Sequence, residues 1–301
     1  MEFKAPYETY SGRVREVAIG SGDKLVKVGG EGALPFHFFE GEIPNPPRLC
    51  LEVIDMEPEG WAPYLVEPYK DVIGDPPRWA KKCEEYGADM VCLSLLSTEP
   101  SAKDTSPEEA GETVKRVLDA INVPLIVYGS GNVEKDREVL PKVCEMCSGA
   151  GLLIGPLQKE NFEAIIGPAL DHGHFVVSQA PLDINLQKEL NVKIGKNFPP
   201  ERIVIDPLAP ALGYGMEYGF SLMERIKQIG VIHKDPMMQM PIIAYFGGEC
   251  WKQKEAKEGE EQGILWEALS ALAFVLAGAN ILVMRHPKTL SLLREIMEVK
   301  K

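Results

Sequence analysis

The sequence predicts an α/β fold, a (β/α)₈ barrel preceded by a β-hairpin extension at the N-terminus. Eight short, nearly continuous apolar runs recur along the chain, which is typical of parallel strands buried on both faces. These runs begin at Leu49, Asp89, Pro124, Gly151, His174, Arg202, Pro241 and Ala279. A helical pattern follows each run, so that eight strand–helix units occupy residues 49–301. A doubly wound open sheet is the alternative, because the sequence does not reveal closure.

The first 48 residues lie outside this repeat, and we expect them to form a hairpin and a connector (residues 1–48) ahead of the barrel (residues 49–301). Val17 and Ile19 precede a Gly-rich turn at residues 20–23, and a second apolar stretch follows at residues 25–28. This hairpin is expected to plug the bottom of the barrel. The Pro-rich residues 44–47 predict a stiff connector.

Helix starts are marked by capping residues. Asp75 is a good N-cap, and Pro76 after it fits the first position of a helix. A capping box begins at Ser106, and Ser221 repeats its spacing, which predicts another helix start there. The other helices are expected from Val133 and over residues 161–170, 183–191, 263–277 and 288–299.

One predicted helix, over residues 264–276, is apolar around nearly its whole circumference. Such a helix must be covered on more than one side, either by another subunit or by the N-terminal segment. The charged run at residues 249–261 just before it is expected to be a solvated loop.

Charge and hydropathy narrow the classes of protein. The chain of 301 residues has 32 Lys and Arg against 45 Asp and Glu, a net charge of −13. This acidic balance argues against nucleic acid and anionic membrane surfaces as partners. The longest uncharged run, residues 268–284, is too short and broken to span a bilayer. The first residues lack a signal-peptide pattern, so we expect a cytoplasmic protein.

The cysteines and histidines give no metal centre. Cys144 and Cys147 form the single C-x-x-C pair, whereas an iron–sulfur cluster normally needs four ligands. We therefore expect no iron–sulfur cluster in this chain, and two small buried side chains at this pair. His172 and His174 precede the fifth strand, which assigns them to the bottom of the barrel, where residues mainly serve stability.

Function in this architecture lies at the carboxyl ends of the strands. Residues 129–132 (Gly-Ser-Gly-Asn) join the third strand to a helix, and either a ligand or anion contact or a tight turn explains them equally well. Asp206 ends the sixth strand and begins a loop in which Gly213 and Gly215 flank Tyr214. The glycines permit close approach, and Tyr214 offers a flat face. No catalytic triad, nucleophile elbow or zinc-protease motif occurs, so no residue is assigned a catalytic role.

Residues 93–140 and 206–218 closely resemble the small subunit of the corrinoid iron–sulfur protein of the anaerobic acetyl-CoA (Wood–Ljungdahl) pathway. The archaeal counterpart is the delta subunit of the acetyl-CoA decarbonylase/synthase complex, and the resemblance covers essentially the whole chain. It implies a TIM barrel in a heterodimer with a larger subunit that carries a 4Fe–4S cluster and a cobalamin-binding domain. The corrinoid, with its cobalt, lies between the two subunits.

The resemblance implies a methyl carrier that is not catalytic alone. The corrinoid would carry a methyl group from methyltetrahydrofolate, or a methanopterin relative, to acetyl-CoA synthase during carbon fixation, and the methyltransferase and acetyl-CoA synthase would bind transiently. No D-x-H-x-x-G cobalamin signature occurs, so this chain supplies only one wall of the site. The expected corrinoid contacts are Thr98, Gly129, Ser130, Gly131, Asn132, Gln179, Asp206, Gly213, Tyr214, Phe246 and Arg285.

Two enzyme functions are weighed against this one. A pterin-dependent methyltransferase acting on a corrinoid protein is the first alternative. The strand ends at Asp55 and Ser97 do not reproduce the Asp/Asn set that such barrels use on the pterin ring. An aldolase-type enzyme would need a strand-end lysine for a Schiff base, and none of the eight strand ends has one.

Overall fold

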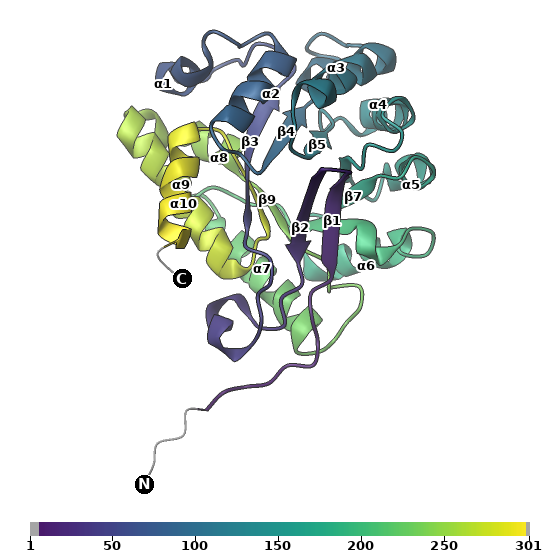
Figure 1. Cartoon of the computed structure of the whole chain (residues 1–301), viewed down its shortest axis with the longest axis vertical. Coiled ribbons are helices and arrows are strands. Elements are labelled where there is room, and N and C mark those ends of the chain that lie inside the picture. Colours follow the sequence, from purple (N-terminus) through teal and green to yellow (C-terminus); the bar gives the residue numbers. More distant parts are fainter. Residues whose placement is uncertain (1–5, 299–301) are drawn as a thin grey trace.

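The structure is a computed structural model that describes residues 6–298. Eight parallel strands form a barrel surrounded by helices, and a hairpin crosses one end of it (Figure 1). The strands are β3 (Arg48–Ile54), β4 (Met90–Ser94), β5 (Leu125–Tyr128), β6 (Leu153–Leu157), β7 (Phe175–Gln179), β8 (Ile203–Asp206), β9 (Ile243–Tyr245) and β10 (Ile281–Met284). All eight predicted strands are confirmed.

The sheet closes on itself. Strands β3 to β8 pair in chain order, and β10 pairs with both β3 and β9. Strands β8 and β9 are joined by a parallel bridge between Ile205 and Ile242, with the Ile205 amide donating to the Pro241 carbonyl at 2.8 Å. This closure confirms the barrel over the open sheet.

Ten α-helices are present among the described residues. They are α1 (Pro63–Val66), α2 (Pro76–Glu85), α3 (Pro107–Ala120), α4 (Val133–Met146), α5 (Phe162–Asp171), α6 (Ile184–Ile194), α7 (Met216–Val231), α8 (Gly247–Lys252), α9 (Glu260–Ala277) and α10 (Pro287–Glu298). Asp75 caps α2, and Ser106 with Glu109 forms the predicted capping box of α3. Between residues 6 and 298, each helix is too short or too polar to cross a bilayer.

Short 3₁₀ helices fill several connections. They are η1 (Pro35–Glu40), η2 (Glu67–Tyr69), η3 (Leu96–Thr98), η4 (Pro200–Arg202) and η5 (Glu255–Lys257). The N-terminal segment η1 packs against α9, so part of the cover that α9 requires comes from this chain.

Two sequence predictions are wrong in detail. Ser221 does not begin a helix: α7 starts five residues earlier, after Gly215, whose φ of 87° lets the chain turn into the helix. The capping-box spacing at Ser221 falls inside the helix, where Ser and Glu side chains point into solvent. The charged run at residues 249–261 is not a solvated loop throughout, because Cys250 and Trp251 of α8 are buried and hold that part against the barrel.

The hairpin closes the bottom of the barrel, as expected. Strand β1 (Glu16–Ser21) pairs antiparallel with β2 (Lys24–Gly29). Val17, Ile19 and Val28 are buried in the same apolar cluster as the inward-facing residues of the barrel strands. The Gly20 amide donates to the carbonyl of Gly151, which precedes β6, so the hairpin lies at the amino ends of the strands (Figure 1). The opposite end is left for function.

The bottom face also holds the cysteine pair and the two histidines. Cys144 and Cys147 are buried, as predicted. His174 is fully buried, accepts from the Leu152 amide through Nδ1, and lies with Nε2 2.9 Å from the Cys144 carbonyl. These contacts give His174 a structural task, linking α4 to the start of β6.

Candidate functional site

The mouth of the barrel, at the carboxyl ends of the strands, is filled by the chain's own side chains. Tyr128 at the end of β5 and Tyr245 at the end of β9 stack with ring centroids 4.8 Å apart and 20° between the planes. Because these two strands face each other across the barrel, the stacked pair bridges the opening. On either side of it lies a separate polar network.

The first network surrounds a buried carboxylate. Glu52 of β3 accepts hydrogen bonds from Ser94 at 3.0 Å and from the Tyr245 hydroxyl, and it forms an ion pair with Arg285 at 2.5 Å. Burial opposes ionisation of Glu52, but the guanidinium of Arg285 and the two hydroxyls hold the pKa of this carboxyl below its ordinary value. Glu52 is therefore a charged group locked in place beneath the mouth.

Arg285 joins this network to the rim. Its guanidinium lies over the Trp61 ring at 4.8 Å from the centroid, a cation–π arrangement. The Arg285 amide donates to Glu267 of α9 at 2.7 Å, and its carbonyl accepts from Tyr69 at 2.7 Å. Both ends of the residue are thus fixed, and the guanidinium is presented at the edge of the mouth.

The second network is built around Asp206 at the end of β8. Asp206 accepts from Tyr128 at 3.0 Å, from Gln179 at 2.8 Å and from the Leu208 amide at 3.0 Å. Burial raises the pKa of Asp206, although these hydrogen bonds act in the opposite direction. All three donors come from this chain, so the Asp206 carboxylate already has partners on both oxygens.

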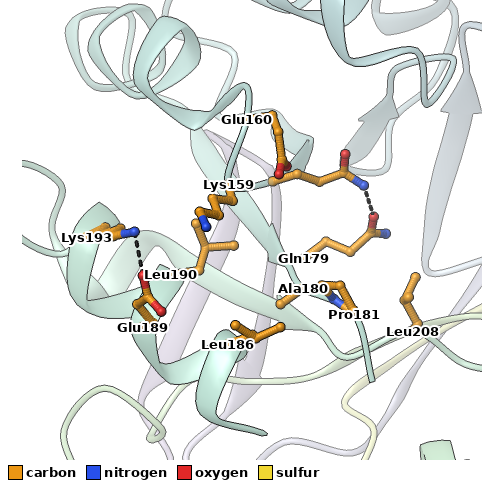
Figure 2. Close-up of a pocket in the computed structure, with 11 residues that line it drawn as sticks. Lys159, Glu160, Gln179, Ala180, Pro181, Leu186, Glu189, Leu190, Lys193 and Leu208 are labelled. Atoms are coloured by element: carbon orange, nitrogen blue, oxygen red, sulfur yellow. Dashed lines mark hydrogen bonds and ion pairs between the residues drawn. The ribbon is translucent and has the colours of Figure 1, made fainter. Parts of the chain in front are cut away.

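A cavity of about 410 Å³ opens between the loops after β6, β7 and β8 (Figure 2). Gln158 donates to the Gln179 carbonyl oxygen at 2.7 Å along one wall. Leu186 and Leu190 of α6 form an apolar wall. Leu208 completes the lining with a φ of 62°, a left-handed conformation that is strained for a leucine. The cavity therefore combines side-chain amides and aliphatic surface with charged side chains, which are those of Lys159, Glu160, Glu189 and Lys193.

A second cavity, of about 450 Å³, lies on the other side of the mouth. Trp61 and Arg285 line it together with Ser130 from the loop after β5. Neither cavity is deep in the barrel, because the tyrosine pair and the two networks occupy that space.

The turn at residues 129–132 does not form a free anion site. The carboxylate of Asp136 accepts from the amides of Ser130 and Gly131 at 2.9 and 3.1 Å. Burial raises the pKa of Asp136 to about 6 against the effect of these bonds. A Cβ on Gly129 would lie 2.2 Å from this carboxylate, which explains the glycine. The amides of Ser130 and Gly131 are therefore already bonded within the chain.

The predicted site residues divide by their exposure. Thr98 and Phe246 are fully buried: Thr98 donates to the Leu95 carbonyl at 2.7 Å, and Phe246 packs on Phe274 at 5.3 Å between centroids. Their side chains do not reach the rim surface. Three more of the predicted site residues are buried or nearly buried, namely Gly129, Gln179 and Asp206. The other predicted site residues are partly or fully exposed, and they are Ser130, Gly131, Asn132, Gly213, Tyr214 and Arg285.

Several residues of the mouth were missed from the sequence. Glu52, Ser94, Tyr128, Tyr245 and Trp61 carry the networks described above. A carboxylate inside an apolar run, as at Glu52, was a usable signal, because such a group must find a partner. The partners themselves come from strands far apart in sequence, and no local pattern marks them.

The rim fits a corrinoid as one wall and not as a complete site. Side-chain amides at Gln158, Gln179 and Asn132 suit the amides at the edge of a corrin, and the exposed Tyr214 suits its flat face. His37 lies in η1, while His172, His174 and His233 lie between helices and the strands that follow them, at the bottom end, and His286 is fully buried. His286, which follows β10, is thus the imidazole at the rim end, and its buried Nε2 has no hydrogen-bond partner among the described residues. In residues 6–298, no cluster of three metal-binding side chains occurs.

Comparison with known families gives a match over nearly the whole chain. The family model for the CO dehydrogenase/acetyl-CoA synthase delta subunit matches residues 16–299. The delta 1 subunit of the acetyl-CoA decarbonylase/synthase complex of Methanosarcina thermophila is 38% identical over 294 residues, covering 93% of this chain and 67% of the relative. The delta subunit of Methanopyrus kandleri is 39% identical over 289 residues, covering 93% of this chain and 71% of the relative.

Solved structures with the same architecture include dihydropteroate synthases. The enzyme of Xanthomonas albilineans with 4-aminobenzoic acid matches with a TM-score of 0.61 at 16% identity, covering 86% of this chain and 95% of that one. The enzyme of Thermus thermophilus matches with a TM-score of 0.55 at 18% identity over the same shares. At this identity, the likeness shows the barrel fold alone.

Proposed function

The chain belongs to the CO dehydrogenase/acetyl-CoA synthase delta subunit family, and we propose that it is a non-catalytic methyl-carrier subunit. In this proposal, its barrel rim forms one wall of a corrinoid site that is completed by a larger corrinoid iron–sulfur subunit. The methyl group would come from methyltetrahydrofolate or a methanopterin relative and go to acetyl-CoA synthase. These partners would place the protein in the cytoplasm.

One observation carries the proposal: the mouth is closed while the rim around it is open. The Tyr128–Tyr245 stack and the networks at Glu52 and Asp206 fill the centre of the mouth with the chain's own side chains. The loops around the mouth nevertheless expose amide, aromatic and aliphatic groups beside two cavities. A surface of this kind suits a broad, flat ligand that lies across the rim rather than one that enters the barrel.

The contacts proposed for the corrinoid are accordingly the exposed part of the predicted set. They are Ser130, Gly131, Asn132, Gly213, Tyr214 and Arg285. The predicted contact Gln179 is kept because it lines the cavity in Figure 2, and Gln158 and Leu208 are added from the same cavity. Asp206 would act indirectly, because it orients the Gln179 amide and holds Leu208 in its strained conformation. Thr98, Gly129 and Phe246 would support the rim from below.

In this proposal, these residues hold the corrinoid and cover one face of its ring. A bound corrinoid supplies the methyl-carrying centre, and the chain supplies no acid or base for transfer. The side chains of Gln158 and Gln179 would bind an amide arm of the corrin ring in the cavity between these two residues and α6. Tyr214, which is 73% exposed, would cover one face of the ring and withdraw when the methyl group is exchanged.

The alternative, a pterin-dependent methyltransferase, has less support. Such an enzyme needs an open polar mouth, and here the Asp206 carboxylate is already bonded to Tyr128, Gln179 and the Leu208 amide. An anaerobic assay with methyltetrahydrofolate and free cobalamin should show no turnover by the chain alone. Turnover that is abolished by Asp206→Ala would establish the alternative instead.

Corrinoid retention by the co-expressed heterodimer tests the proposal directly. Asn132→Ala, Tyr214→Ala and Gln158→Ala should each lower the cobalt content and visible absorbance of the purified complex. The expected loss is ~1–3 kcal/mol per buried polar contact. His172→Ala, at the bottom of the barrel, is the matched control and should retain the corrinoid, since His172 contacts Ser148 there. If His172→Ala loses the corrinoid while the rim variants retain it fully, the corrinoid site lies at the bottom of the barrel and the proposal is wrong.

A further inference from the structure

The guanidinium of Arg285 is fixed at the barrel mouth, but its two terminal nitrogens are unpaired. Its Nε donates to Oε2 of Glu52 at 2.5 Å, and its Cζ lies 4.8 Å from the centroid of the Trp61 ring. Nη1 and Nη2 have no hydrogen-bond partner among residues 6–298. The side chain is 12% exposed and lines the cavity of about 450 Å³ beside the mouth. The N–H groups of the two terminal nitrogens therefore face this cavity without an acceptor.

Glu52 is the reason that these donors are left over. Its Oε1 already accepts from the hydroxyls of Ser94 and Tyr245, and its Oε2 accepts from Nε of Arg285. A carboxylate that faced the end of the arginine side chain would take both terminal nitrogens in a bidentate pair. Glu52 instead lies buried beneath the mouth and binds through Nε, so it leaves the terminal nitrogens for another acceptor.

Gly248 of α8 leaves room for the guanidinium in this position. A Cβ on Gly248 would lie 3.0 Å from Nη2 and 3.3 Å from Cζ of Arg285, which is closer than an ordinary contact. The backbone of Gly248 is not in the left-handed region, so its conformation does not itself require glycine. An alanine at this position would therefore displace the guanidinium without straining the backbone.

The charges around the cavity favour a neutral ligand. The cavity is lined by three carboxylates and two ammonium groups besides Arg285, those of Glu57, Glu59, Glu99, Lys252 and Lys257. The Lys252 ammonium pairs with Glu249 at 2.6 Å, and the charge of Arg285 is balanced by Glu52. No excess of positive charge is left to attract a phosphate or a carboxylate. A carboxamide fits better, because its carbonyl oxygen accepts from Arg285 and its N–H groups can donate to the carboxylates.

Sites that suit amides thus lie on both sides of the closed mouth. Gln158 and Gln179 line the cavity of about 410 Å³ in Figure 2, and Arg285 lines the cavity on the other side. A corrin carries carboxamide arms around its edge, so one ring lying across the tyrosine pair would extend arms into both cavities. We infer that Arg285, held in place by Glu52, binds the carbonyl oxygen of an amide arm of the corrinoid. This inference rests on the proposed function and adds a second arm site, with Glu52 as its positioning residue.

The test measures the dissociation constant of the corrinoid from the purified heterodimer, followed by visible absorbance. Arg285→Lys keeps a positive charge beside Glu52 but loses the pair of terminal nitrogens. Gly248→Ala leaves every charge in place and displaces the guanidinium. Each variant should raise the dissociation constant about tenfold, as expected for one lost hydrogen-bonded contact.

Each of the two changes has a matched control at the bottom of the barrel. Arg294→Lys makes the same substitution in an arginine that pairs with Asp89 at 3.2 Å, just before β4. Gly32→Ala adds a Cβ that would lie 3.6 Å from Nε of Arg13, an ordinary contact beside another guanidinium. Both controls should bind the corrinoid as the wild type does.

Glu52→Gln tests the positioning role. If Glu52 acts by holding Arg285, this variant should also weaken corrinoid binding, and adding it to Arg285→Lys should weaken binding no further. Losses that add up in the double variant would mean that Glu52 acts independently of Arg285, and would overturn this role. Circular dichroism and thermal unfolding verify that each variant is folded, and Gly248→Ala decides the inference if Glu52→Gln is not.

Cobinamide separates the amide arms from the rest of the cofactor, because it has these arms but lacks the nucleotide tail with its phosphate. Arg285→Lys should weaken the binding of cobinamide and of the complete corrinoid by the same factor. If only the complete corrinoid is affected, Arg285 binds the phosphate and the inference is overturned.

The rim variants keep this inference apart from the proposed function. If Arg285→Lys and Gly248→Ala bind as the wild type does while Tyr214→Ala loses the corrinoid, the second arm site is wrong and the proposed function stands. If all three variants retain the corrinoid fully, both the inference and the proposed corrinoid wall are wrong.

Discussion

The rings of Tyr128 and Tyr245 stack across the barrel mouth at 4.8 Å, and each hydroxyl reaches a different buried carboxylate. Tyr128 donates to Asp206 and Tyr245 donates to Glu52. The stacked pair thus ties the two polar networks into one layer that closes the barrel. The carboxylates of Glu52 and Asp206 would otherwise face a cavity, and both receive hydrogen bonds from within the chain.

This layer predicts graded losses at Tyr245. Tyr245→Phe keeps the stack but removes the hydroxyl beside Glu52 and Ser94, and should lower the free energy of unfolding by about 1–3 kcal/mol. Tyr245→Leu loses the ring contact as well, which adds about 0.5–1.5 kcal/mol. Chemical denaturation measures both values. Tyr218→Phe, at an exposed position, should leave stability unchanged, and equal losses for Phe and Leu at position 245 would argue against a contribution from the stack.

The turn after β5 gives a second prediction. Gly129→Ala places a Cβ 2.2 Å from the Asp136 carboxylate, so the loop must shift, at a cost of about 1–3 kcal/mol. Asp136→Ala should also destabilise, because the amides of Ser130 and Gly131 lose their acceptor. The double variant should cost less than the sum by about 0.5–3 kcal/mol, since the two residues are in contact.

Gly167→Ala is the control for this pair. Gly167 lies inside α5, and nothing is within 4 Å of the Cβ that alanine would add. Pro168 follows Gly167, however, and its ring crowds a Cβ on the preceding helical residue. This crowding offsets the gain of about 0.5–1 kcal/mol in helix propensity, so Gly167→Ala should leave the stability nearly unchanged. Strict additivity of Gly129→Ala and Asp136→Ala would mean that the carboxylate does not enforce the glycine.

The sequence predicts the barrel well because each of its signals is local. Buried parallel strands leave continuous apolar runs, and Asp75 and Ser106 sit one residue before the helices that they cap. The capping-box spacing at Ser221 does not mark a helix start, because Ser221 and Glu224 lie inside α7 with both side chains in solvent. A serine and a glutamate at this spacing do not destabilise the helix there. The start of α7 is decided instead by Gly215, whose positive φ the spacing does not encode.

The mouth is harder to predict, because its partners are distant in the chain. Glu52 meets Tyr245 and Arg285 from strands 193 and 233 residues away. Asp206 was found as a strand-end carboxylate, but its hydrogen bonds to Tyr128 and Gln179 turn it from an exposed ligand into a buried support. Whether a strand-end side chain is exposed depends on which side chains of other strands fill the barrel. The sequence pattern of one strand does not reveal this.

The buried pair at the bottom end gives a third prediction. Lys227 donates to Glu31 at 2.5 Å and to Asn280 at 2.7 Å, and both charged side chains are nearly inaccessible. Lys227→Met leaves Glu31 buried without its counter-charge and should cost about 3–5 kcal/mol. Adding Glu31→Leu should recover much of this loss. Hydrogen exchange should show faster opening of residues 29–34 in the single variant, and a single variant as stable as wild type would contradict the pair's structural role.

The last prediction concerns pH and Glu267 of α9. This carboxylate accepts from the amides of Arg285 and His286 at 2.7 and 3.1 Å, and so connects α9 to the rim residue Arg285. Burial raises the pKa of Glu267 from 4.5 to about 7 against these hydrogen bonds. The folded chain therefore keeps a proton between these pH values that the unfolded chain has released.

Stability should consequently fall as pH rises from 4.5 to 7. Relative to Glu267→Gln, which cannot ionise, the wild-type free energy of unfolding should decrease by about 1.4 kcal/mol per pH unit in this window, about 3 kcal/mol in total. Urea denaturation at pH 5, 6, 7 and 8 measures the difference, which should level off above pH 7. Glu261→Gln, an exposed change on the same helix, should follow the wild-type curve. A constant difference between Glu267→Gln and wild type at all four pH values would mean that Glu267 ionises normally, so that the link between α9 and Arg285 does not depend on its protonation.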